Sequence, residues 1–270
     1  MITDDEFQRI VKYMKRKAGI NLSAKRVLIQ GRLDNYLQKN GYESYSRFLD
    51  VVENYPTGIE AEYMINALTT NHTYFWREHE QFLYLKEHVF PQMARWEADS
   101  RDWHIWCAAS STGEEPYTLA MLCMDYLGLD QPNWDTQVLA TDIDTHVLDI
   151  ARKGIYTKDS VEHLPHSYVR RFFRNYSDKE YQVTKELKEQ VLFRQFNLMN
   201  PLPFSRPLHV VFLRNVMIYF EEETKLRLLN QIYDKLMPGG YLFIGSTESI
   251  NQNHGKFEYI KPSVYRKPLY

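Results

Sequence analysis

The most informative polar residues follow two apolar segments that the sequence predicts to be buried strands. Segment 103–108 leads into a loop of small residues, 109–113, and segment 137–140 is followed closely by Asp142. In an open α/β sheet the ligand lies beyond the carboxyl ends of the strands, so both loops should border one site. Small residues let the backbone approach a ligand closely, and an acid at the place of Asp142 suits the two hydroxyls of a ribose. We expect Asp144 to cap the helix that follows.

The class of ligand follows partly from motifs that the sequence does not contain. It has neither G-x-G-x-x-G nor G-x-x-x-x-G-K-[ST], so a cradle for a pyrophosphate is not favoured. A loop of small residues and an acid for a ribose, without a phosphate site, favour a nucleoside such as S-adenosylmethionine. A dinucleotide-binding fold with a degenerate loop is the alternative. The nine histidines form no H-x-x-x-H or H-E-x-x-H pattern, and we expect no metal.

Strands and helices alternate along the chain after about residue 80. Further strands are predicted at 191–196, 209–213 and 241–245, and helices at 114–127 and 222–236. This alternation is typical of an α/β fold in which helices cover both faces of a parallel sheet. The polar stretch 177–189 interrupts the alternation, and we predict a small hairpin insertion there.

The first 68 residues have a purely helical pattern. Apolar residues recur at helical spacing in four short segments, which are separated by turns at Gly19, at Gly41 and at 56–58. This predicts a small helical bundle. Ten basic and two acidic residues between Phe7 and Leu49 give that stretch a net charge of +8, so the rest of the chain carries −10. A basic lobe on an acidic body indicates an acidic partner.

Composition limits the class of protein. With 270 residues, 44% of them hydrophobic, the chain can form one large domain or a small domain plus a large one. Two cysteines are too few for a disulfide framework and fit a reducing compartment. No apolar run approaches the roughly 20 residues of a membrane span, and the acidic first residues are unlike a secretory signal. We expect a monomeric cytoplasmic protein without membrane insertion.

Five longer motifs occur in the order found in one known family. Segment 68–78, LTTNHTYFWRE, resembles the L-T-T-N-x-T-x-F-F-R-E segment of the CheR family, the chemotaxis receptor glutamate methyltransferases. Segment 106–117, WCAASSTGEEPY, is similar to that family's W-x-A-x-x-S-T-G-E-E-P-Y. The others are ATDID at 140–144, RNVMIYF at 214–220 and PGGYLFIGS at 238–246. The chain is identified as a member of this family, and the resemblance covers almost the whole sequence.

The resemblance implies a fold and an activity. It implies a basic all-α receptor-docking domain (1–70), a linker with a cofactor-binding motif (71–90), and a Rossmann-like methyltransferase domain (91–270) with a β-subdomain at about 175–195. The implied reaction transfers the methyl group of S-adenosyl-L-methionine to glutamate side chains on the cytoplasmic helices of methyl-accepting chemotaxis receptors, leaving S-adenosyl-L-homocysteine. Segment 174–181 lacks glycine, whereas family members that dock on a C-terminal receptor pentapeptide tend to have a longer, glycine-containing loop. We therefore expect independence from such a pentapeptide.

The resemblance also suggests roles for charged and phenolic side chains. Arg77 is expected to hold a carboxylate in its planar guanidinium, either the cofactor's own or the incoming glutamate's; a structural ion pair with Glu78 or Glu80 is the alternative. Tyr219 is expected to donate a hydrogen bond to the substrate carboxylate, with core packing as the alternative. Glu114 is expected to pair with the cofactor's ammonium group, although a carboxylate at a helix start is favourable in any case.

The remaining cofactor contacts are expected from residues in these motifs or just after a predicted strand, in addition to Asp142 at the ribose. They are Asn71 and Thr73 for the methionine moiety, Asn197 and Leu198 for the adenine edge, and Arg214 and Asn215 to close the pocket. Arg26 and Arg32 lie within about 120° of each other on the predicted second helix. We expect them to border one exposed face that docks an acidic receptor helix, with ordinary solvated charges as the alternative.

Two other functions stay open at this point. A nucleic-acid methyltransferase would use the basic lobe to bind DNA or RNA, although the sequence has no N-P-P-Y motif and we expect no nucleic-acid partner. A non-catalytic adaptor would keep the S-adenosylmethionine pocket as a sensor, although Arg77 and Tyr219 are both present.

Overall fold

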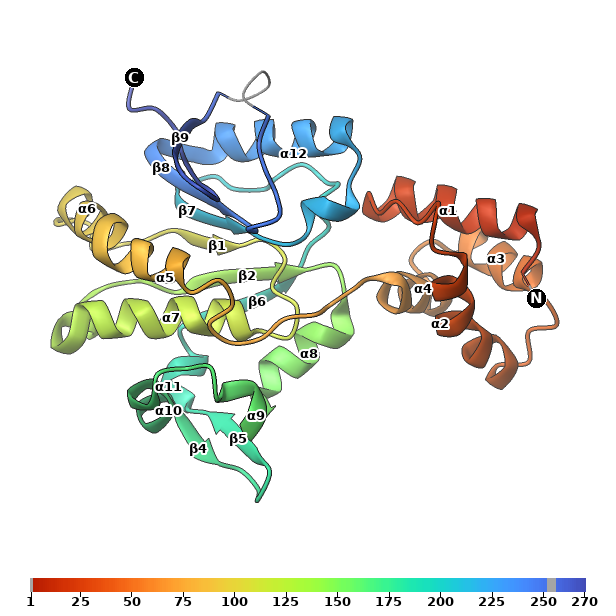
Figure 1. Cartoon of the computed structure of the whole chain (residues 1–270), viewed down its shortest axis with the longest axis horizontal. Helices are drawn as coiled ribbons and strands as arrows, with labels where there is room; N and C mark the ends of the chain where they lie inside the picture. Colours follow the sequence, from red (N-terminus) through yellow and green to blue (C-terminus); the bar gives the residue numbers. More distant parts are fainter. Residues whose placement is uncertain (1, 252–255) are drawn as a thin grey trace.

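Four short helices form the N-terminal domain of the structure, a computed structural model that describes residues 2–251 and 256–270. They are α1 (Asp4–Ala18), α2 (Arg26–Lys39), α3 (Tyr45–Asn54) and α4 (Ile59–Leu68) (Figure 1). Thr3 and Glu6 form a capping box at the start of α1, which satisfies two backbone donors. Gly19 ends α1 with φ 74°, a left-handed conformation that glycine adopts without steric cost. The helices share a buried apolar core, which confirms the predicted bundle.

A seven-stranded sheet forms the centre of the second domain. Its order is β6-β2-β1-β7-β8-β10-β9. The strands are β1 (Ile105–Cys107), β2 (Val138–Asp142), β6 (Val191–Gln195), β7 (Leu208–Leu213), β8 (Leu236–Ile244), β9 (Glu258–Lys261) and β10 (Val264–Arg266). The first five strands in this order are parallel, as predicted, but β10 pairs antiparallel with both β8 and β9. The sheet is therefore mixed, because two short C-terminal strands add to its edge. The apolar and polar residues of these two strands do not clearly alternate.

Helices cover both faces of this sheet. They include α5 (Glu80–Tyr84), a π-helical turn η1 (Leu85–Val89), α6 (Phe90–Trp96), α7 (Glu114–Leu127), a 3₁₀ turn η2 (Gly128–Asn133), α8 (Thr145–Lys153) and α12 (Glu222–Lys235). Alternate residues of the strands belong to two separate apolar cores: Trp106 and Val211 to one, Cys107 and Phe212 to the other. Helix α12 lies on the first face and α7 on the second (Figure 1). The first core continues into the helical domain.

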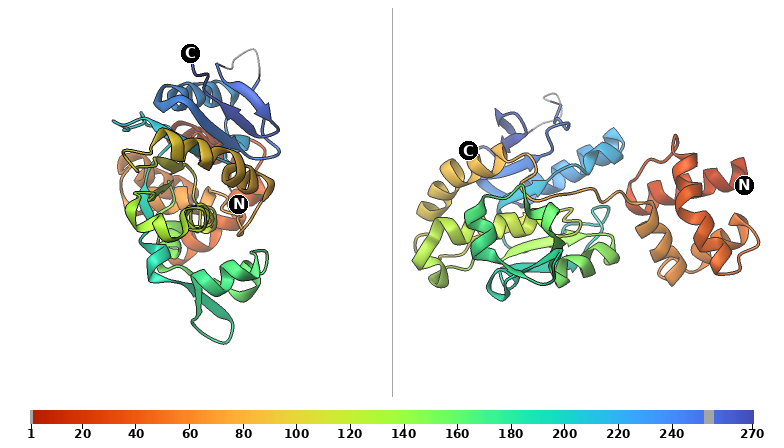
Figure 2. Two further views of the ribbon diagram at one scale, coloured as in Figure 1. Left: turned by 90° about the vertical axis from the view of Figure 1, so that its left-hand side faces the viewer. Right: turned by 60° about the horizontal axis from the view of Figure 1, so that its bottom comes forward.

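A second, three-stranded sheet projects from the α/β domain (Figure 2). It has the antiparallel order β3-β5-β4. Its elements are β3 (Ile155–Thr157), α9 (Lys158–Val161), α10 (His166–Phe172), β4 (Phe173–Asn175), β5 (Glu180–Val183) and α11 (Lys185–Lys188). The expected start at about residue 175 was therefore too late, because β3 follows α8 directly and pairs with a strand much further along the chain.

An extended linker joins the two domains. It leaves α4 at Thr69 and crosses the edge of the large sheet before α5 begins at Glu80 (Figure 1). The linker is thus shorter than the expected 71–90, since its second half is helical. Among residues 2–251 and 256–270, no helix combines the length and the apolar character needed to cross a lipid bilayer.

Candidate active site

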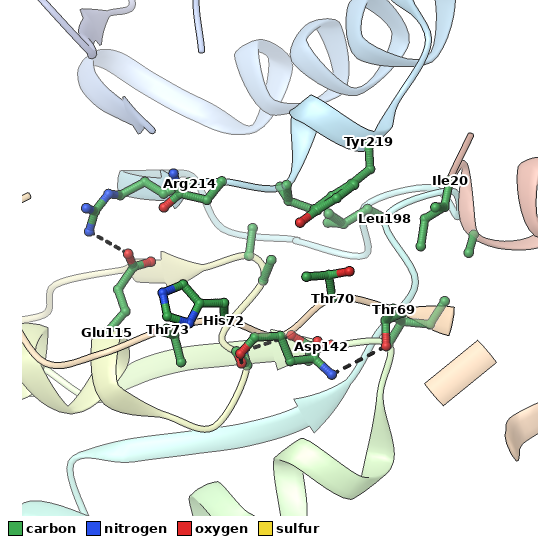
Figure 3. Close-up of a pocket in the computed structure, with 18 of the residues that line it drawn as sticks. Ile20, Thr69, Thr70, His72, Thr73, Glu115, Asp142, Leu198, Arg214 and Tyr219 are labelled. Atoms are coloured by element: carbon green, nitrogen blue, oxygen red, sulfur yellow. Dashed lines mark hydrogen bonds and ion pairs between the residues drawn. The ribbon is translucent and has the colours of Figure 1, made fainter. Parts of the chain in front are cut away.

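A pocket that is partly open to solvent lies at the carboxyl ends of β1, β2 and β7. This is the edge at which sequence spacing predicted a ligand. Its lining includes Ala18, Ile20, Asn71, His72, Thr73, Tyr74, Arg77, Ala108, Ser111, Glu115, Asp142, Ile143, Phe196, Asn197, Leu198, Arg214, Asn215 and Tyr219. The pocket therefore brings together all but one of the predicted cofactor and catalytic residues (Figure 3).

Asp142 ends β2 and is 8% exposed at the floor of the pocket. Its carboxylate accepts hydrogen bonds from the backbone N–H groups of Ser111 (2.8 Å) and Asp144 (3.0 Å). Burial raises the pKa of Asp142 to about 6 even though these hydrogen bonds oppose the shift. No cation of the described chain forms an ion pair with it, so a ligand that donates hydroxyl groups would stabilise its ionised form.

Asp144 has the capping role that the sequence predicted. One carboxylate oxygen accepts from the N–H groups of His146 and Val147 at the start of α8. The other accepts from the side-chain amide of Asn71 (2.7 Å) and the hydroxyl of Thr69 (3.2 Å). Asn71 lines the pocket, but its amide nitrogen is directed to Asp144. The cap therefore also fixes the linker against the sheet.

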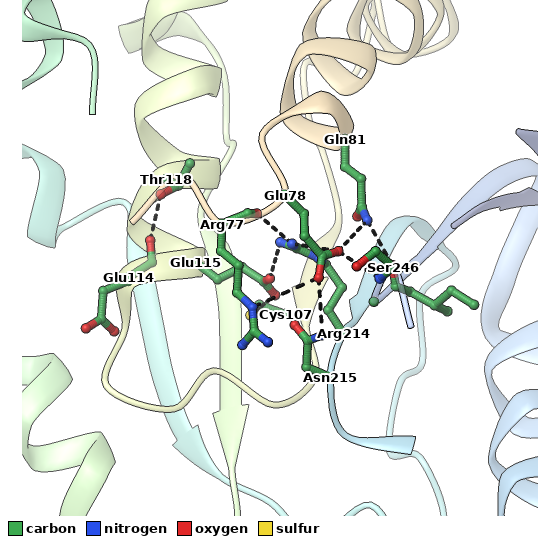
Figure 4. Close-up of polar contacts among 12 residues, drawn as sticks. Arg77, Glu78, Gln81, Cys107, Glu114, Glu115, Thr118, Arg214, Asn215 and Ser246 are labelled. Atoms are coloured by element: carbon green, nitrogen blue, oxygen red, sulfur yellow. Dashed lines mark hydrogen bonds and ion pairs between the residues drawn. The ribbon is translucent and has the colours of Figure 1, made fainter. Parts of the chain in front are cut away.

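The turn that carries Arg77 has an unusual backbone. Trp76 and Glu78, on either side of Arg77, have φ values of 66° and 57°, which cost non-glycine residues free energy and persist only where the surroundings enforce them. The Glu78 carboxylate accepts hydrogen bonds from the backbone N–H of Ser246 (2.9 Å) and the amide of Gln81 (2.9 Å) (Figure 4). These contacts hold the turn so that Arg77 faces the pocket.

Arg214 anchors the same turn from the end of β7. Its side chain, 1% exposed, forms ion pairs with Glu78 (3.2 Å) and Glu115 (2.6 Å) and donates to the backbone oxygen of Arg77 (2.6 Å). Burial favours a higher pKa for Glu78, but Arg214 and Asn215 outweigh it and the pKa is lowered. At the more deeply buried Glu115, burial prevails over Arg214 and raises the pKa. Arg214 is thus shared between two carboxylates beside the pocket.

Glu114 does not lie where we expected it. Its carboxylate accepts from the hydroxyl of Thr112 (2.7 Å), and the residue is not part of the pocket lining. The neighbouring Glu115 lies in the lining instead. Successive residues in the first turn of a helix point about 100° apart, so only one of the pair can face the pocket. The motif places both carboxylates at the start of α7, but their order alone did not show which of them lies in the lining.

The wall of the pocket opposite Asp142 is formed by the segment after β7. Tyr219 lies in the 3₁₀ turn η3 (Met217–Tyr219) and lines the pocket opposite Asp142 (Figure 3). Asn215 adopts φ 56° and donates its amide to Glu78 (3.3 Å). Asn197 donates its amide to the backbone oxygen of Lys17 in the helical domain (2.6 Å), and Leu198 contributes an apolar surface beside it.

Arg26 and Arg32 border one open hollow of the surface, as their helical spacing predicted, but both guanidinium groups already have partners within the chain. Arg26 forms an ion pair with Asp4, and its guanidinium lies 4.5 Å from the ring centroid of Phe7. Arg32 donates to the backbone oxygens of Ala67 (3.0 Å) and Thr69 at the carboxyl end of α4. A cation satisfies free carbonyl groups at a helix end, so Arg32 has a structural role that its helical position did not reveal.

Sequence reasoning missed several residues that border the pocket. Ala18 and Ile20 come from the helical domain, and His72 and Tyr74 come from the linker. His72 and Tyr74 were inside a recognised motif and were not assigned. Nothing in the local sequence indicated that the end of α1 would reach the edge of the sheet, because this contact depends on the arrangement of the two domains.

The side chains that line the pocket fit S-adenosylmethionine. Asp142 suits ribose hydroxyls, Ile143, Phe196 and Leu198 offer apolar surface for an adenine, and Arg77 offers a cation for a carboxylate. An open α/β sheet with such a nucleoside pocket at its carboxyl edge defines an S-adenosylmethionine-dependent methyltransferase. Residues that would bind the cofactor lie on the strand ends and the linker, where the fold holds them in fixed positions.

Comparison with known proteins identifies the family. The model for the CheR methyltransferase SAM-binding domain matches residues 71–266, and that for the CheR all-alpha domain matches residues 5–69. The chain is 37% identical to a chemotaxis protein methyltransferase of Borreliella burgdorferi over 270 residues, covering 98% of this chain and 95% of that protein. It is 35% identical to the Escherichia coli protein of the same description, covering 98% and 91%. The chain belongs to the CheR methyltransferase family.

Proposed function

We propose that this methyltransferase acts on glutamate side chains in the cytoplasmic helical domain of methyl-accepting chemotaxis receptors. The names of its relatives support a role in chemotaxis. The observation that carries the choice of a carboxylate acceptor is a contrast between two pocket arginines. Arg214 is 1% exposed and forms close ion pairs with two carboxylates. Arg77 lines the pocket with 25% of its side chain exposed; it lies 4.0 Å from the Glu78 carboxylate, the alternative partner, and donates to the backbone oxygen of His72 (2.9 Å). A partly exposed guanidinium with only one distant carboxylate partner suits an incoming carboxylate.

A carboxylate acceptor needs no general base. Glutamate is ionised near pH 7, so its oxygen attacks directly. Bound S-adenosylmethionine supplies a methyl group on a sulfonium: the carbon–oxygen bond forms as the carbon–sulfur bond breaks, and the electron pair remains on sulfur. Because an anion and a cation neutralise one another, the protein has to align the reactants and exclude water.

Two residues are assigned to the acceptor. Arg77 holds one edge of the glutamate carboxylate through charge-assisted hydrogen bonds. Tyr219, in the turn after β7, donates its phenolic hydrogen to the same carboxylate. Their support is geometric: both line one pocket although they are carried by the linker and by the turn after β7. Tyr219 also packs against the first apolar core, but it is only half-buried and lines the pocket.

The cofactor contacts are assigned to the surrounding side chains. Asp142 accepts from the ribose, and Asn197 and Leu198 border the adenine. Thr73 and Asn71 lie toward the methionine moiety. Asn215 closes the pocket together with Arg214, which acts chiefly through the turn that it anchors. Glu114 is withdrawn from this set because it lies outside the lining.

The location and the docking mode follow from the proposed acceptor. An enzyme that modifies cytoplasmic receptor helices works in the cytoplasm, and the net charge of +8 on residues 7–49 suits an acidic helix.

Strands β4 and β5 are joined by the short turn 176–179, in which the backbone N–H of Tyr176 donates to the backbone oxygen of Glu180 (3.0 Å). This short glycine-free turn supports docking that does not need a receptor pentapeptide. We propose that the enzyme acts as a monomer.

The proposal is tested by offering several acceptors at once. The full chain is incubated with methyl-labelled S-adenosylmethionine and with receptor cytoplasmic fragments, DNA or RNA in separate reactions. We expect label only on the receptor, as an ester that is released by base. Base-stable label on nucleic acid would favour a nucleic-acid methyltransferase, and cofactor binding without transfer to any acceptor would favour an adaptor.

A further inference from the structure

The end of the first helix forms part of the methyl-transfer pocket. Ala18 is the last residue of α1, and Ile20 follows in the loop toward α2; both line the pocket although they belong to the helical domain. They are 5% and 8% exposed. Ile20 lies on the side of Leu198 and Tyr219 (Figure 3). The helical domain therefore supplies a wall of the site and is not separated from it by solvent.

Two hydrogen bonds tie this wall to residues assigned to the site. The backbone N–H of Asn21 donates to the backbone oxygen of Tyr219 (2.9 Å). The side-chain amide of Asn197 donates to the backbone oxygen of Lys17 (2.6 Å). The acceptor side and the adenine side of the pocket are thus each anchored to the same few residues at the end of α1.

Gly19 packs against Met199 and Phe220 of the second domain, so an added β-carbon would have to displace the flexible end of the Met199 side chain. A β-carbon added at Gly19 would lie 2.6 Å from Met199 Sδ and 3.3 Å from Phe220, the residue after Tyr219. The nearby ion pair between Lys15 and Glu221 (2.8 Å) is solvent-exposed, so it adds little. Backbone contacts and packing, not surface charge, hold the wall in place.

We propose that Ala18, Gly19, Ile20 and Asn21 are positioning residues of the methyl-transfer site. They hold the turn of Tyr219 and the segment of Asn197 at the separation that S-adenosylmethionine requires. Because linkage is reciprocal, bound cofactor in turn stabilises the contact between the two domains. The inference needs the cofactor pocket but does not depend on which acceptor the enzyme methylates.

Gly41 offers a matched control for a test at Gly19. Both glycines follow a helix of the same domain with nearly equal φ values, 74° and 73°, but no described atom lies within 4 Å of a β-carbon added at Gly41. Asparagine tolerates this conformation better than other side chains. The variants Gly19→Asn and Gly41→Asn therefore impose similar backbone strain, and only the first inserts a side chain between the domains.

The first readout is the affinity for S-adenosylmethionine by calorimetry, which involves no acceptor. We expect Gly19→Asn to weaken binding about tenfold, equivalent to about 1.4 kcal/mol, while Gly41→Asn stays within about twofold of the original protein. Equal affinities in the two variants would overturn the inference. If the unaltered protein binds the cofactor but methylates no receptor, the proposed function fails and this inference is unaffected.

The second readout needs no variant. Amide hydrogen exchange of a peptide covering 19–25 is measured with and without S-adenosylmethionine. We expect the exchange of the Asn21 amide to slow when the cofactor binds, and a peptide around Gly41 to be unchanged. Identical exchange at Asn21 in both states would show that the wall does not respond to the cofactor, and would overturn the coupling.

Discussion

Cofactor binding should depend on pH through Asp142. The pKa of this carboxyl is raised to about 6 by burial, and a proton on it removes the acceptor that ribose hydroxyls need. The free protein therefore binds a proton that the complex excludes, so affinity is greatest above the pKa and falls as pH drops through it. A group that had to be protonated in order to donate a hydrogen bond to the ligand would show the opposite pH dependence of affinity.

The size of this pH dependence follows from the pKa of Asp142. At pH 8 nearly all Asp142 is ionised, whereas at pH 5 the ionised fraction is about one in eleven for a pKa of about 6. The dissociation constant for S-adenosylmethionine should therefore rise roughly tenfold between pH 8 and pH 5, which is about 1.4 kcal/mol. Binding at pH 5 should release close to one proton from this site.

Calorimetry across this pH range, in buffers of different ionisation enthalpy, measures both the affinity and the proton release. Asp142→Asn is the control, because it keeps the size of the side chain and cannot ionise. Its binding should be weaker at pH 8 by about 1 to 3 kcal/mol and should lack the tenfold dependence. A flat profile for the unaltered protein, or the same slope in Asp142→Asn, would refute the assignment, provided circular dichroism shows both proteins folded.

Three substitutions and one control variant separate catalysis, the buried ion pairs and helix capping. Tyr219→Phe should lower kcat with near-normal cofactor affinity; an unchanged kcat would mean that Tyr219 only packs. Arg214→Met leaves the buried Glu115 without its cation and should lower the free energy of unfolding by about 3 to 5 kcal/mol, measured with denaturant, whereas Lys225→Met, which breaks a more exposed pair, should cost less than about 1 kcal/mol. Arg32→Ala should lower stability by about 1 to 3 kcal/mol; an unchanged unfolding curve with a raised receptor KM would restore its docking role.

Much of the site was predictable because it follows from strand ends. Asp142 ends β2 and Asp144 follows where the chain leaves the sheet, so the capping role of Asp144 could be predicted from its place just before the helix. The motif around Arg77 fixed its place in the pocket. Local order along the chain was enough wherever the residue and the element that positions it are neighbours in sequence.

The rest depends on contacts between distant segments. Arg32 is bound by carbonyl groups of residues 67 and 69, so its exposure could not be judged from its own helix. Glu114 and Glu115 lie on different faces of α7, and only the face that carries Glu115 meets Arg214. Strand β3 is recognisable only through its pairing with β5. The wall formed by Ile20 likewise exists only once the two domains are placed together.

The central claim is that the acceptor is a glutamate carboxylate of a chemotaxis receptor. The most direct measurement is mass spectrometry of a receptor cytoplasmic fragment after incubation with the enzyme and S-adenosylmethionine, with matched fragments in which each candidate glutamate is replaced by alanine. We predict a methyl group on specific glutamate side chains that base treatment removes and that the matching replacement abolishes. A methyl group on nitrogen, or a receptor left unmodified by an enzyme that binds the cofactor, would contradict the account.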